Sequence, residues 1–397
     1  MPHRPLRFLL LSASMGAGHD AVAGELARRL RARGHEVVLR DVLTLLPAGA
    51  GRALRAGYRG TVRHLPRLYD AVYAGFLAPG AGPRPSSAPL AALAERPLLR
   101  AVDRWRPDAV VATFHLAAQV TGRLRASGAL AVPAAVVVVD FAVHRGWLHA
   151  GNDLHVCVTE RAAADVRTAT GRTAEATGPV VPARFFRAGD AAGTGAGTGG
   201  EWRALLRRYG RPEHGGLGAD AADGADAGTA VLLSAGAWGV GHELTATAGR
   251  LARHGWLPVL LCGRDERLRR HAAAVPRLLA LGWVADMPGL MAAARVLVDN
   301  AAGQTAAQAL AAGLPVVAHR PLPGHGAEGV RQMAAAGLSQ WVSGPGQPAA
   351  AVARLARPGP ERERQVAAGR AVFRRDPAQR LEELAVAGRA ASSTGLR

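Results

Sequence analysis

Residues 296–318 read VLVDNAAGQTAAQALAAGLPVVA, and this stretch decides the fold. A short apolar run ends at Asp299, a turn with Gly303 follows, and small apolar residues then continue at helical spacing. Gly313 stands where a helix commonly ends, and Pro315 opens a second apolar run. The order of strand, glycine turn, helix and strand is typical of a parallel sheet covered by helices.

The same alternation extends over most of the 397 residues, enough for two domains. Ala188–Gly200 and Glu213–Gly228 are rich in Gly and Ala, cannot bury a core, and are expected to form a linker. A short helix is predicted between them at Trp202–Tyr209. The predicted strands before the linker are Phe8–Ser12, Glu36–Arg40, Ala109–Thr113, Ala134–Val139 and His155–Thr159, and those after it are Ala230–Ser234, Leu257–Cys262, Leu278–Leu281, Val296–Val298 and Pro315–Ala318.

The chain is strongly basic, with 49 Lys and Arg against 30 Asp and Glu and a formal net charge of +19. The sequence contains no lysine, so every one of these basic side chains is an arginine. Such a surface can attract nucleic acid, an anionic membrane or a phosphorylated substrate. The arginines are scattered and no nucleic-acid-binding motif is present, so we expect no nucleic-acid partner.

The longest apolar run, Ala129–Val139, contains Pro133 and is much shorter than a membrane span, which predicts a soluble or peripheral protein. Arg52–Leu77 is a second distinctive segment, which Pro66 should kink or divide. Two interpretations stay open for it: an amphipathic helix packed on the first domain, or a surface that dips into an anionic membrane. Its apolar stripe at helical spacing is Leu54, Tyr58, Val62, Leu65, Tyr69, Val72 and Phe76, accompanied by Arg52, Arg55, Arg59, Arg63 and Arg67.

The first candidate site is SASMGAGH, residues 12–19, which follows the first strand and opens a helix predicted at Asp20–Arg33. Gly16 and Gly18 let the backbone turn and let a ligand approach the unpaired N–H groups of the helix N-terminus. His19 is a candidate base toward an acceptor hydroxyl, because an imidazole titrates near neutral pH. A capping or structural histidine is the alternative.

The second candidate site is DFAVHRGWLH, residues 140–149, at the carboxyl end of a predicted strand, where open α/β sheets bind ligands. Asp140 is a candidate to orient a base or accept from a sugar hydroxyl, and Trp147 to stack on a sugar or border a lipid. Asp140, His144 and His149 do not match a known metal-ligand spacing, so we expect no metal site.

Two further glycine turns lie in the second half, SAGAWGVG at residues 234–241 and DNAAGQT at residues 299–305. Each offers backbone amides to a phosphate, although either one alone is also an ordinary strand-to-helix turn. Gln308, one turn into the second helix, is placed to reach a ribose diol. The segment CGRDE, residues 262–266, lies between the two turns.

Together these motifs resemble the family of diacylglycerol glucosyltransferases and plant galactolipid synthases, whose C-terminal domain is shared with the lipid II glucosaminyltransferase. The resemblance covers roughly residues 5–342 in order and spacing. The segments that carry it are SASMGAGH at 12–19, VVDFAVHRGWLH at 138–149, LLSAGAWGVG at 232–241, the stretch LGWVADMPGLMAAARVLVDNAAGQTAAQALAAGLPVV at 281–317, and PLPGHGAEGV at 321–330.

The resemblance implies an α/β GT-B fold, in which two Rossmann-like domains have parallel sheets facing across a cleft. It implies an acceptor-binding domain at residues 1–187, the linker region at 188–228, and a nucleotide-sugar-binding domain at 229–348. Residues 349–397 would be helices that return to the N-terminal domain. The protein would be cytoplasmic and peripherally associated with the inner face of the cell membrane.

The resemblance also implies roles for individual residues. His19 and Asp140 would be catalytic, and Gly16, Gly18, His144 and Trp147 would bind the acceptor. Backbone amides and helix dipoles would stabilise the leaving diphosphate, so neither metal nor cofactor is expected. The UDP-sugar donor would be held by Gly236, Trp238, Gly239, Trp283, Val284, Asn300, Gly303, Gln304, Thr305, Gln308 and Glu328.

Three positions depart from the family pattern. Gln308 replaces the carboxylate that grips both ribose hydroxyls, and a neutral amide binds them more weakly than a charge-assisted pair. Gly326 replaces an acidic residue, and Gly329 replaces the asparagine that reads the sugar. The leading hypothesis is inverting transfer of a hexose from a UDP-sugar to a membrane lipid such as diacylglycerol. The alternatives are transfer to a soluble natural product, and a non-catalytic nucleotide-sugar- or lipid-binding relative.

Overall fold

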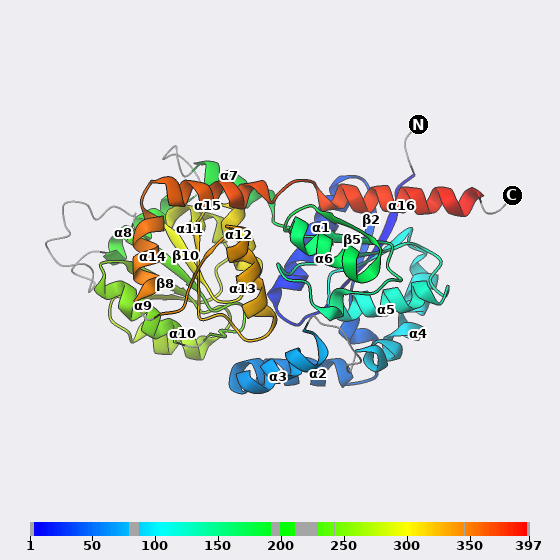
Figure 1. Cartoon of the computed structure of the whole chain (residues 1–397), viewed down its shortest axis with the longest axis horizontal. Coiled ribbons are helices and arrows are strands. Elements are labelled where there is room, and N and C mark those ends of the chain that lie inside the picture. The colour runs from blue at the N-terminus through cyan, green and yellow to red at the C-terminus, as the bar shows by residue number, and fades with distance from the viewer. Residues whose placement is uncertain are drawn as a thin grey trace. The chain divides into compact units, whose positions relative to one another are not determined.

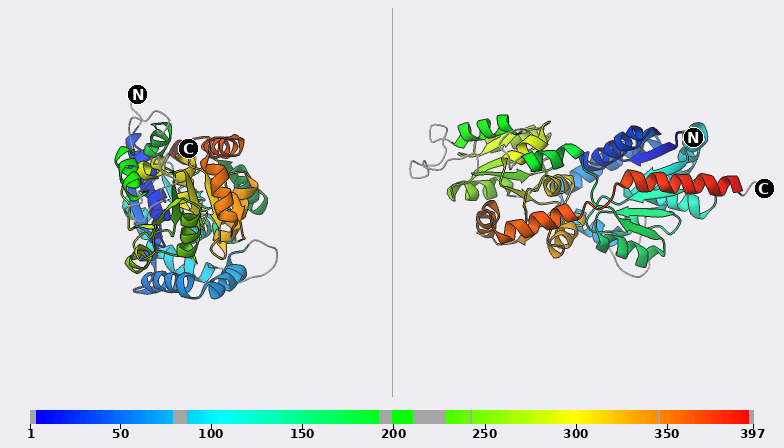
Figure 2. Two further views of the ribbon diagram at one scale, coloured as in Figure 1. Left: turned by 90° about the vertical axis from the view of Figure 1, so that its left-hand side faces the viewer. Right: turned by 90° about the horizontal axis from the view of Figure 1, so that it is seen from above.

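The computed structural model describes residues 4–78, 87–191, 199–210, 229–241, 243–344 and 346–394 (Figure 1, with two further views in Figure 2). The chain divides into two compact units. Unit 1 comprises Met1–Val180 and Val372–Arg397, and unit 2 comprises Val181–Ala371. Each unit is built on one six-stranded sheet whose neighbouring strands all pair in parallel, which confirms the predicted α/β class.

The sheet of unit 1 has the strand order β2-β1-β3-β4-β5-β6. Its strands are β1 (Arg7–Ser12), β2 (Glu36–Asp41), β3 (Ala109–Ala112), β4 (Ala134–Val137), β5 (Leu154–Cys157) and β6 (Thr173–Ala176). Its helical elements are α1 (Ala17–Ala32), η1 (Val42–Leu45), α2 (Ala50–His64), α3 (Pro66–Phe76), α4 (Ala88–Trp105), α5 (His115–Ala126), η2 (Arg145–Trp147), α6 (Glu160–Thr170) and α16 (Pro377–Thr394).

Both faces of this sheet are buried, because alternate residues of one strand enter different cores. In β1, Leu9 and Leu11 point into a core shared with α4, α5 and α6. Phe8 and Leu10 point into a core shared with α1 and α16. This two-sided burial accounts for the continuous apolar runs that predicted the strands.

The sheet of unit 2 has the strand order β12-β11-β10-β7-β8-β9. Its strands are β7 (Ala230–Ser234), β8 (Leu257–Leu261), β9 (Leu279–Leu281), β10 (Val296–Asp299), β11 (Val316–His319) and β12 (Gln340–Val342). Its helices are α7 (Ala183–Ala191), α8 (Gly200–Gly210), α9 (Leu244–Arg253), α10 (Glu266–Ala273), α11 (Met287–Ala293), α12 (Gln304–Ala311), α13 (His325–Ala335), α14 (Gln347–Ala356) and α15 (Pro360–Ala371).

All ten predicted strands are present, and two further strands among the described residues were missed. These are β6 and β12, which lie at the edges of the two sheets and are only partly buried. The predicted helix at Trp202–Tyr209 is found as α8, whereas most of the predicted linker lies outside the described residues.

The unit boundaries differ from the predicted domain limits. The last segment was expected to return to the first domain from residue 349, but α14 and α15 belong to unit 2 and only residues from Val372 onward belong to unit 1. The reason is visible in α15, where the Gln365 side chain accepts from Val316 N–H (2.8 Å) and donates to Val316 C=O (3.2 Å). This pairing fixes α15 to β11. Helix α7 likewise belongs to unit 2, not to residues 1–187.

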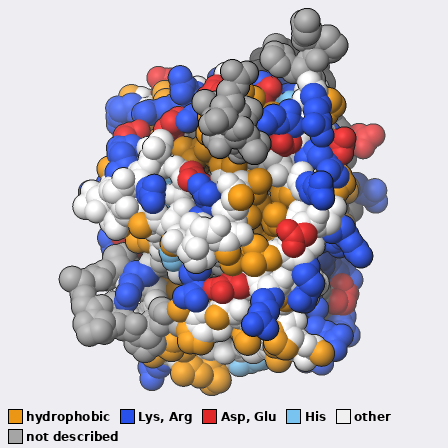
Figure 3. All heavy atoms as spheres, turned by 90° about the vertical axis from the view of Figure 1, so that its right-hand side faces the viewer, with side chains coloured by type: hydrophobic (Ala, Val, Ile, Leu, Met, Phe, Trp, Pro, Cys, Tyr) orange, Lys and Arg blue, Asp and Glu red, His pale blue; other side chains and the backbone are white. Residues whose placement is uncertain are grey.

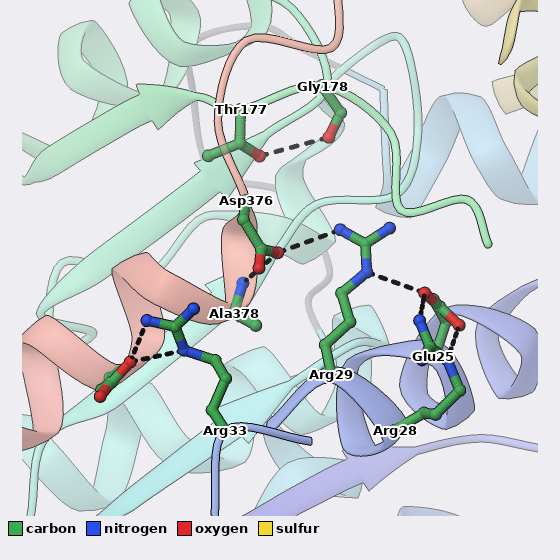
Figure 4. Close-up of polar contacts among 9 residues, drawn as sticks. Glu25, Arg28, Arg29, Arg33, Thr177, Gly178, Asp376 and Ala378 are labelled. Atoms are coloured by element: carbon green, nitrogen blue, oxygen red, sulfur yellow. Dashed lines mark hydrogen bonds and ion pairs between the residues drawn. The ribbon is translucent and has the colours of Figure 1, made fainter. Parts of the chain in front are cut away.

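The returning segment is fixed to unit 1 through backbone and ionic contacts. Thr177 C=O accepts from Arg374 N–H at 2.9 Å. Asp376 accepts from Ala378 N–H, at the start of α16, and from the Arg29 guanidinium at 3.0 Å (Figure 4). Arg29 also donates to the buried carboxylate of Glu25 on the same helix. Helix α1 and the start of α16 are therefore held together on one face of the sheet.

Pro66 divides the Arg52–Leu77 segment into α2 and α3, as predicted, but the single apolar stripe is wrong. Tyr69 and Tyr73 on α3 are buried against unit 1. Leu65, Leu68, Val72 and Phe76 form a separate row, with exposed fractions between 42% and 54%. Helix α3 therefore carries a buried apolar side and an exposed apolar side. The helical spacing of the sequence did not separate the two.

Gly178 tests the attachment of the returning segment. Its φ is +97°, and an added Cβ would lie 2.3 Å from Val372 C=O, so Gly178→Ala should lower the free energy of unfolding of unit 1 by about 3 kcal/mol. Gly24→Ala on α1 is the control, because nothing lies within 4 Å of a Cβ there, and it should raise stability by about 1 kcal/mol. Thermal and denaturant unfolding measure both changes; equal stability of the two variants would contradict a tight contact at Gly178.

Candidate active site

The glycine loop of unit 1 leaves open space above the start of α1. Gly16 precedes the helix with φ +133°, no side chain caps that end, and nothing lies within 4 Å of a Cβ built on it. Gly18 lies in the first helical turn. Ser14 Oγ donates to Asp41 at 2.5 Å, which fixes the loop to the end of β2. The loop is thus held firmly while its outer side remains accessible.

His19 lies where the chain connections of the sheet diverge. The connection from β1 leads to β2 on one side, and β3 lies on the other side, which is the switch point where open α/β sheets bind ligands. His19 Nδ1 lies 2.9 Å from Thr113 C=O, directly after β3. Because a carbonyl only accepts, Nδ1 carries the hydrogen and Nε2 is the basic nitrogen.

The surroundings of His19 favour the neutral imidazole. Burial lowers its pKa, and the charge of Asp140 offsets this only in part. The ring meets Phe114 edge-on, with centroids 4.9 Å apart. His19 is therefore unprotonated at neutral pH, the form a general base needs.

Asp140 follows β4 and belongs to a polar cluster beside His19. Its Oδ2 accepts from the Trp147 indole N–H at 2.8 Å. His144 Nδ1 accepts from Gly146 N–H at 3.1 Å, so its protonated Nε2 faces Asp140 Oδ2 at 3.5 Å. Asp140 keeps a partly exposed carboxylate that is oriented by two neighbours.

The expected acceptor contacts of Trp147 and His144 need correction. Trp147 is completely buried and His144 is 3% exposed, so neither ring has a face on which a sugar or lipid can rest. Both side chains instead contact the Asp140 carboxylate from the protein interior. Among the described residues, no group of three His, Cys, Asp or Glu side chains is arranged to hold a metal ion.

The first glycine loop of unit 2 follows β7. Gly236 and Gly239 have φ of +65° and +67°. An added Cβ at Gly239 would lie 2.4 Å from Asp265, whereas nothing lies within 4 Å of one at Gly236. Gly239 therefore serves packing and Gly236 borders open space. Trp238 between them is half-buried.

The second glycine loop follows β10, which neighbours β7 at the switch point of this sheet. Asp299 accepts from Ala301 N–H (3.0 Å) and Ala302 N–H (2.7 Å), which shapes the turn. Asn300 donates to Val240 C=O at 3.3 Å and so joins the two loops. Asn300 is buried, so it supports the loops rather than touching a ligand.

Helix α12 offers an uncapped N-terminus beside this turn. Gly303 precedes the helix, no side chain caps that end, and nothing lies within 4 Å of a Cβ built on Gly303. Gln304, Thr305 and Gln308 are half-buried on the first turns. The arrangement suits an anion, because the N-terminal turn and the positive end of the helix dipole border open space.

The remaining predicted donor residues surround these loops at varying depth. Trp283 is 55% exposed and Val284 is half-buried. Glu328 on α13 pairs with Arg331 on its own helix. Gly329 leaves little room, because an added Cβ would lie 3.0 Å from the Cβ of Ala302.

Several contributing residues escaped the sequence analysis. Thr113 contacts His19 through its backbone carbonyl, and the sequence does not indicate such a contact because any residue type has this group. Tyr58 and Tyr69 share a hydroxyl hydrogen bond near Asp140, and burial raises the pKa of Tyr58 to about 12. Both tyrosines had been assigned to an apolar stripe. Only the fold brings α2 and α3 to the end of β4.

Comparison with known proteins agrees with this architecture. The profile of the monogalactosyldiacylglycerol (MGDG) synthase family matches residues 19–181. No curated protein matches the chain in sequence. Among solved structures, MurG of Acinetobacter baumannii is 16% identical with a TM-score of 0.56, covering 96% of this chain and 99% of MurG.

Two further structures have the same fold. The glycosyltransferase of kitacinnamycin is 18% identical with a TM-score of 0.59, covering 96% of this chain and 99% of its own. Anabaena HepE, solved with UDP-glucose, is 14% identical with a TM-score of 0.53, covering 98% of this chain and 100% of HepE. These likenesses establish the GT-B fold.

The electrostatic link between His19 and Asp140 can be measured directly. Asp140→Asn removes a negative charge that raises the pKa of His19, so the pKa should fall below its wild-type value. A pH titration of the His19 ring by NMR measures the change. Asp165→Asn, an exposed carboxylate on α6, should leave the titration unaltered. A rise in the pKa of His19 in Asp140→Asn would contradict the assigned charge interaction.

Proposed function

We propose that this chain, an MGDG-synthase-like glycosyltransferase of the GT-B fold, transfers a hexose from a UDP-sugar to a membrane lipid such as diacylglycerol. Unit 1 would receive the acceptor and unit 2 the donor. The observation that carries the choice of a lipid is the exposed apolar row on α3, a helix whose buried side adjoins the candidate site.

The catalytic step assigns one role to each glycine-loop site. His19 Nε2 takes the proton of the acceptor hydroxyl as its oxygen attacks the anomeric carbon, and the bond from that carbon to the diphosphate breaks. Attack from the face opposite the leaving group inverts the sugar carbon. Asp140 stabilises the imidazolium that forms, because its negative charge lies nearby.

The leaving diphosphate would be stabilised at the Gly236 loop and the N-terminus of α12. Both border open space, and both present backbone amides at the switch point of their sheet. Fixed amides stabilise developing negative charge without reorganising, so the scheme requires no metal ion or other cofactor. Gln308 would meet the ribose with a neutral amide, which predicts a weak grip at that position.

A lipid acceptor requires access to the membrane, and α2 and α3 are suited to provide it. Among the described residues, no helix is long and apolar enough to cross a bilayer. The apolar row Leu65, Leu68, Val72 and Phe76 is exposed instead, next to exposed arginines of α2. Such a surface binds an anionic leaflet through both apolar burial and charge attraction. We propose that the enzyme acts there, on the inner face of the cell membrane.

The inner side of α3 supports a link between this surface and the site. Tyr73 meets His144 edge-on, with ring centroids 6.2 Å apart. Arg145 N–H donates to Leu77 C=O at 2.8 Å, just beyond the helix. A lipid drawn from the leaflet along α3 would arrive next to Asp140.

Donor binding is tested by closing the open space at Gly303. Gly303→Leu should weaken UDP binding roughly tenfold or more, because its side chain would occupy the place of the anion while its φ of −99° suits any residue. Calorimetry with UDP measures the loss, and transfer from UDP-glucose or UDP-galactose to diacylglycerol should fall with it. Gly249→Leu on α9 is the control and should bind UDP normally. Unchanged UDP binding in Gly303→Leu would reject this donor site, and UDP binding without any transfer would favour the non-catalytic alternative.

Membrane docking is tested on the outer side of α3. The double change Leu68→Asp and Val72→Asp should weaken binding to vesicles containing phosphatidylglycerol roughly a hundredfold, because it removes two apolar contacts and adds repulsion. Vesicle sedimentation measures the effect. Val386→Asp, at an exposed position of α16, should bind as the wild type does. If both variants bind alike, the protein has another membrane surface or none, and a soluble acceptor becomes the better hypothesis.

A further inference from the structure

An arginine stacked on an exposed indole lies next to the Gly236 loop. The guanidinium carbon of Arg264 is 4.5 Å from the ring centroid of Trp283. Trp283 is 55% exposed, and Arg264 is also exposed. A cation–π contact at an exposed site is a weak interaction. Neither side chain belongs to the core, so the guanidinium is held only weakly at this position.

The backbone of Arg264 is fixed against the glycine loop. Its N–H donates to Ala237 C=O at 2.9 Å. Gly263, with φ +60°, fits so closely that an added Cβ would lie 2.3 Å from Gly236 C=O. An added Cβ at Gly239 would lie 2.4 Å from the Cβ of Asp265. The segment 263–265 and the loop are thus one rigid assembly, and the base of the Arg264 side chain stands at the edge of the open space above Gly236.

The charge of Arg264 is available, in contrast to that of a neighbouring arginine. Arg269 on α10 donates to both carboxylate oxygens of Glu266, which neutralises it. A ring face attracts a guanidinium but does not neutralise its charge. A phosphate offers Arg264 two parallel charge-assisted hydrogen bonds, which are stronger than a solvent-exposed cation–π contact. A diphosphate that binds here would therefore form hydrogen bonds with the Arg264 guanidinium, with or without loss of its contact with the Trp283 ring.

We propose that Arg264 binds the diphosphate of the nucleotide donor, and that Trp283 holds its guanidinium ready beside the Gly236 loop until the donor arrives. This inference rests on the proposed function, in which unit 2 holds a nucleoside diphosphate. It adds a side-chain cation to a site otherwise built from backbone amides. Arg264 binds the negatively charged diphosphate, and Trp283 is the residue that positions the Arg264 side chain.

Comparing UDP with uridine separates the diphosphate from the rest of the ligand. Arg264→Gln should weaken UDP binding about tenfold and leave uridine binding unchanged, because uridine carries no phosphate. Arg264→Lys should give an intermediate UDP affinity, since it keeps the charge but loses the fork geometry. Trp283→Leu, which removes the ring face, should also weaken UDP. Calorimetry measures all affinities, and thermal unfolding checks that each variant is folded.

The control is Arg267→Gln, which removes one exposed positive charge from the start of α10 and should bind UDP as the wild type does. Equal UDP affinity in Arg264→Gln and the wild type would overturn the inference while leaving the donor site intact. A parallel loss of UDP and uridine binding would also overturn it, because Arg264 would then support the base. If the wild type binds neither ligand, the proposed function fails and this inference fails with it.

Discussion

The structure depends on one constraint, which is that an open parallel sheet leaves room for a ligand at the carboxyl ends of its strands, where neighbouring connections turn to opposite faces. In unit 1 this place lies between β1 and β3, and in unit 2 between β7 and β10. A side-chain hydrogen bond bridges each place, from His19 to Thr113 C=O in the first and from Asn300 to Val240 C=O in the second. The first bridge sets the tautomer of the candidate base, and the second brings two amide-bearing loops together. Both sites thus follow from topology before any special side chain is considered.

Much of this was readable from the sequence because both sheets are buried on both faces. Strands such as Leu257–Leu261 are wholly buried and stand out as apolar runs. Strands β6 and β12 were missed because an edge strand half in solvent, such as TAEA at 173–176, has no such pattern. Glycine positions were informative only in part. Gly236 and Gly303 border open space, whereas Gly239 and Gly241 are required by close packing, and the sequence does not distinguish these two uses.

The errors at the site have a common physical origin, which is that the type of a residue does not reveal how deeply its side chain is buried. Trp147 in a polar loop was expected to meet a ligand, yet its indole N–H serves Asp140 from within the core. Tyr69 and Val72 fit one helical stripe, yet they lie on different sides of α3 because the helix is apolar toward both the protein and its surroundings. A pattern with a period of 3.6 residues identifies a single apolar side well and two sides poorly. His19 stays a prediction, and it differs from these cases because its position directly after a glycine loop limits how deeply the ring can be buried.

The return of the chain to unit 1 also dictates an order of events during synthesis. Ala378, Leu381 and Ala385 of α16 complete the core formed by α1 residues such as Leu26 and one face of the first sheet. They leave the ribosome only after the whole of unit 2 has been made. Unit 2 can therefore close its own core first, while the first unit waits with an apolar sheet face uncovered. The nascent chain thus exposes an apolar sheet face while residues Val181 to Ala371 are translated. Chaperone binding is therefore expected mainly at unit 1, although its larger part is synthesised first.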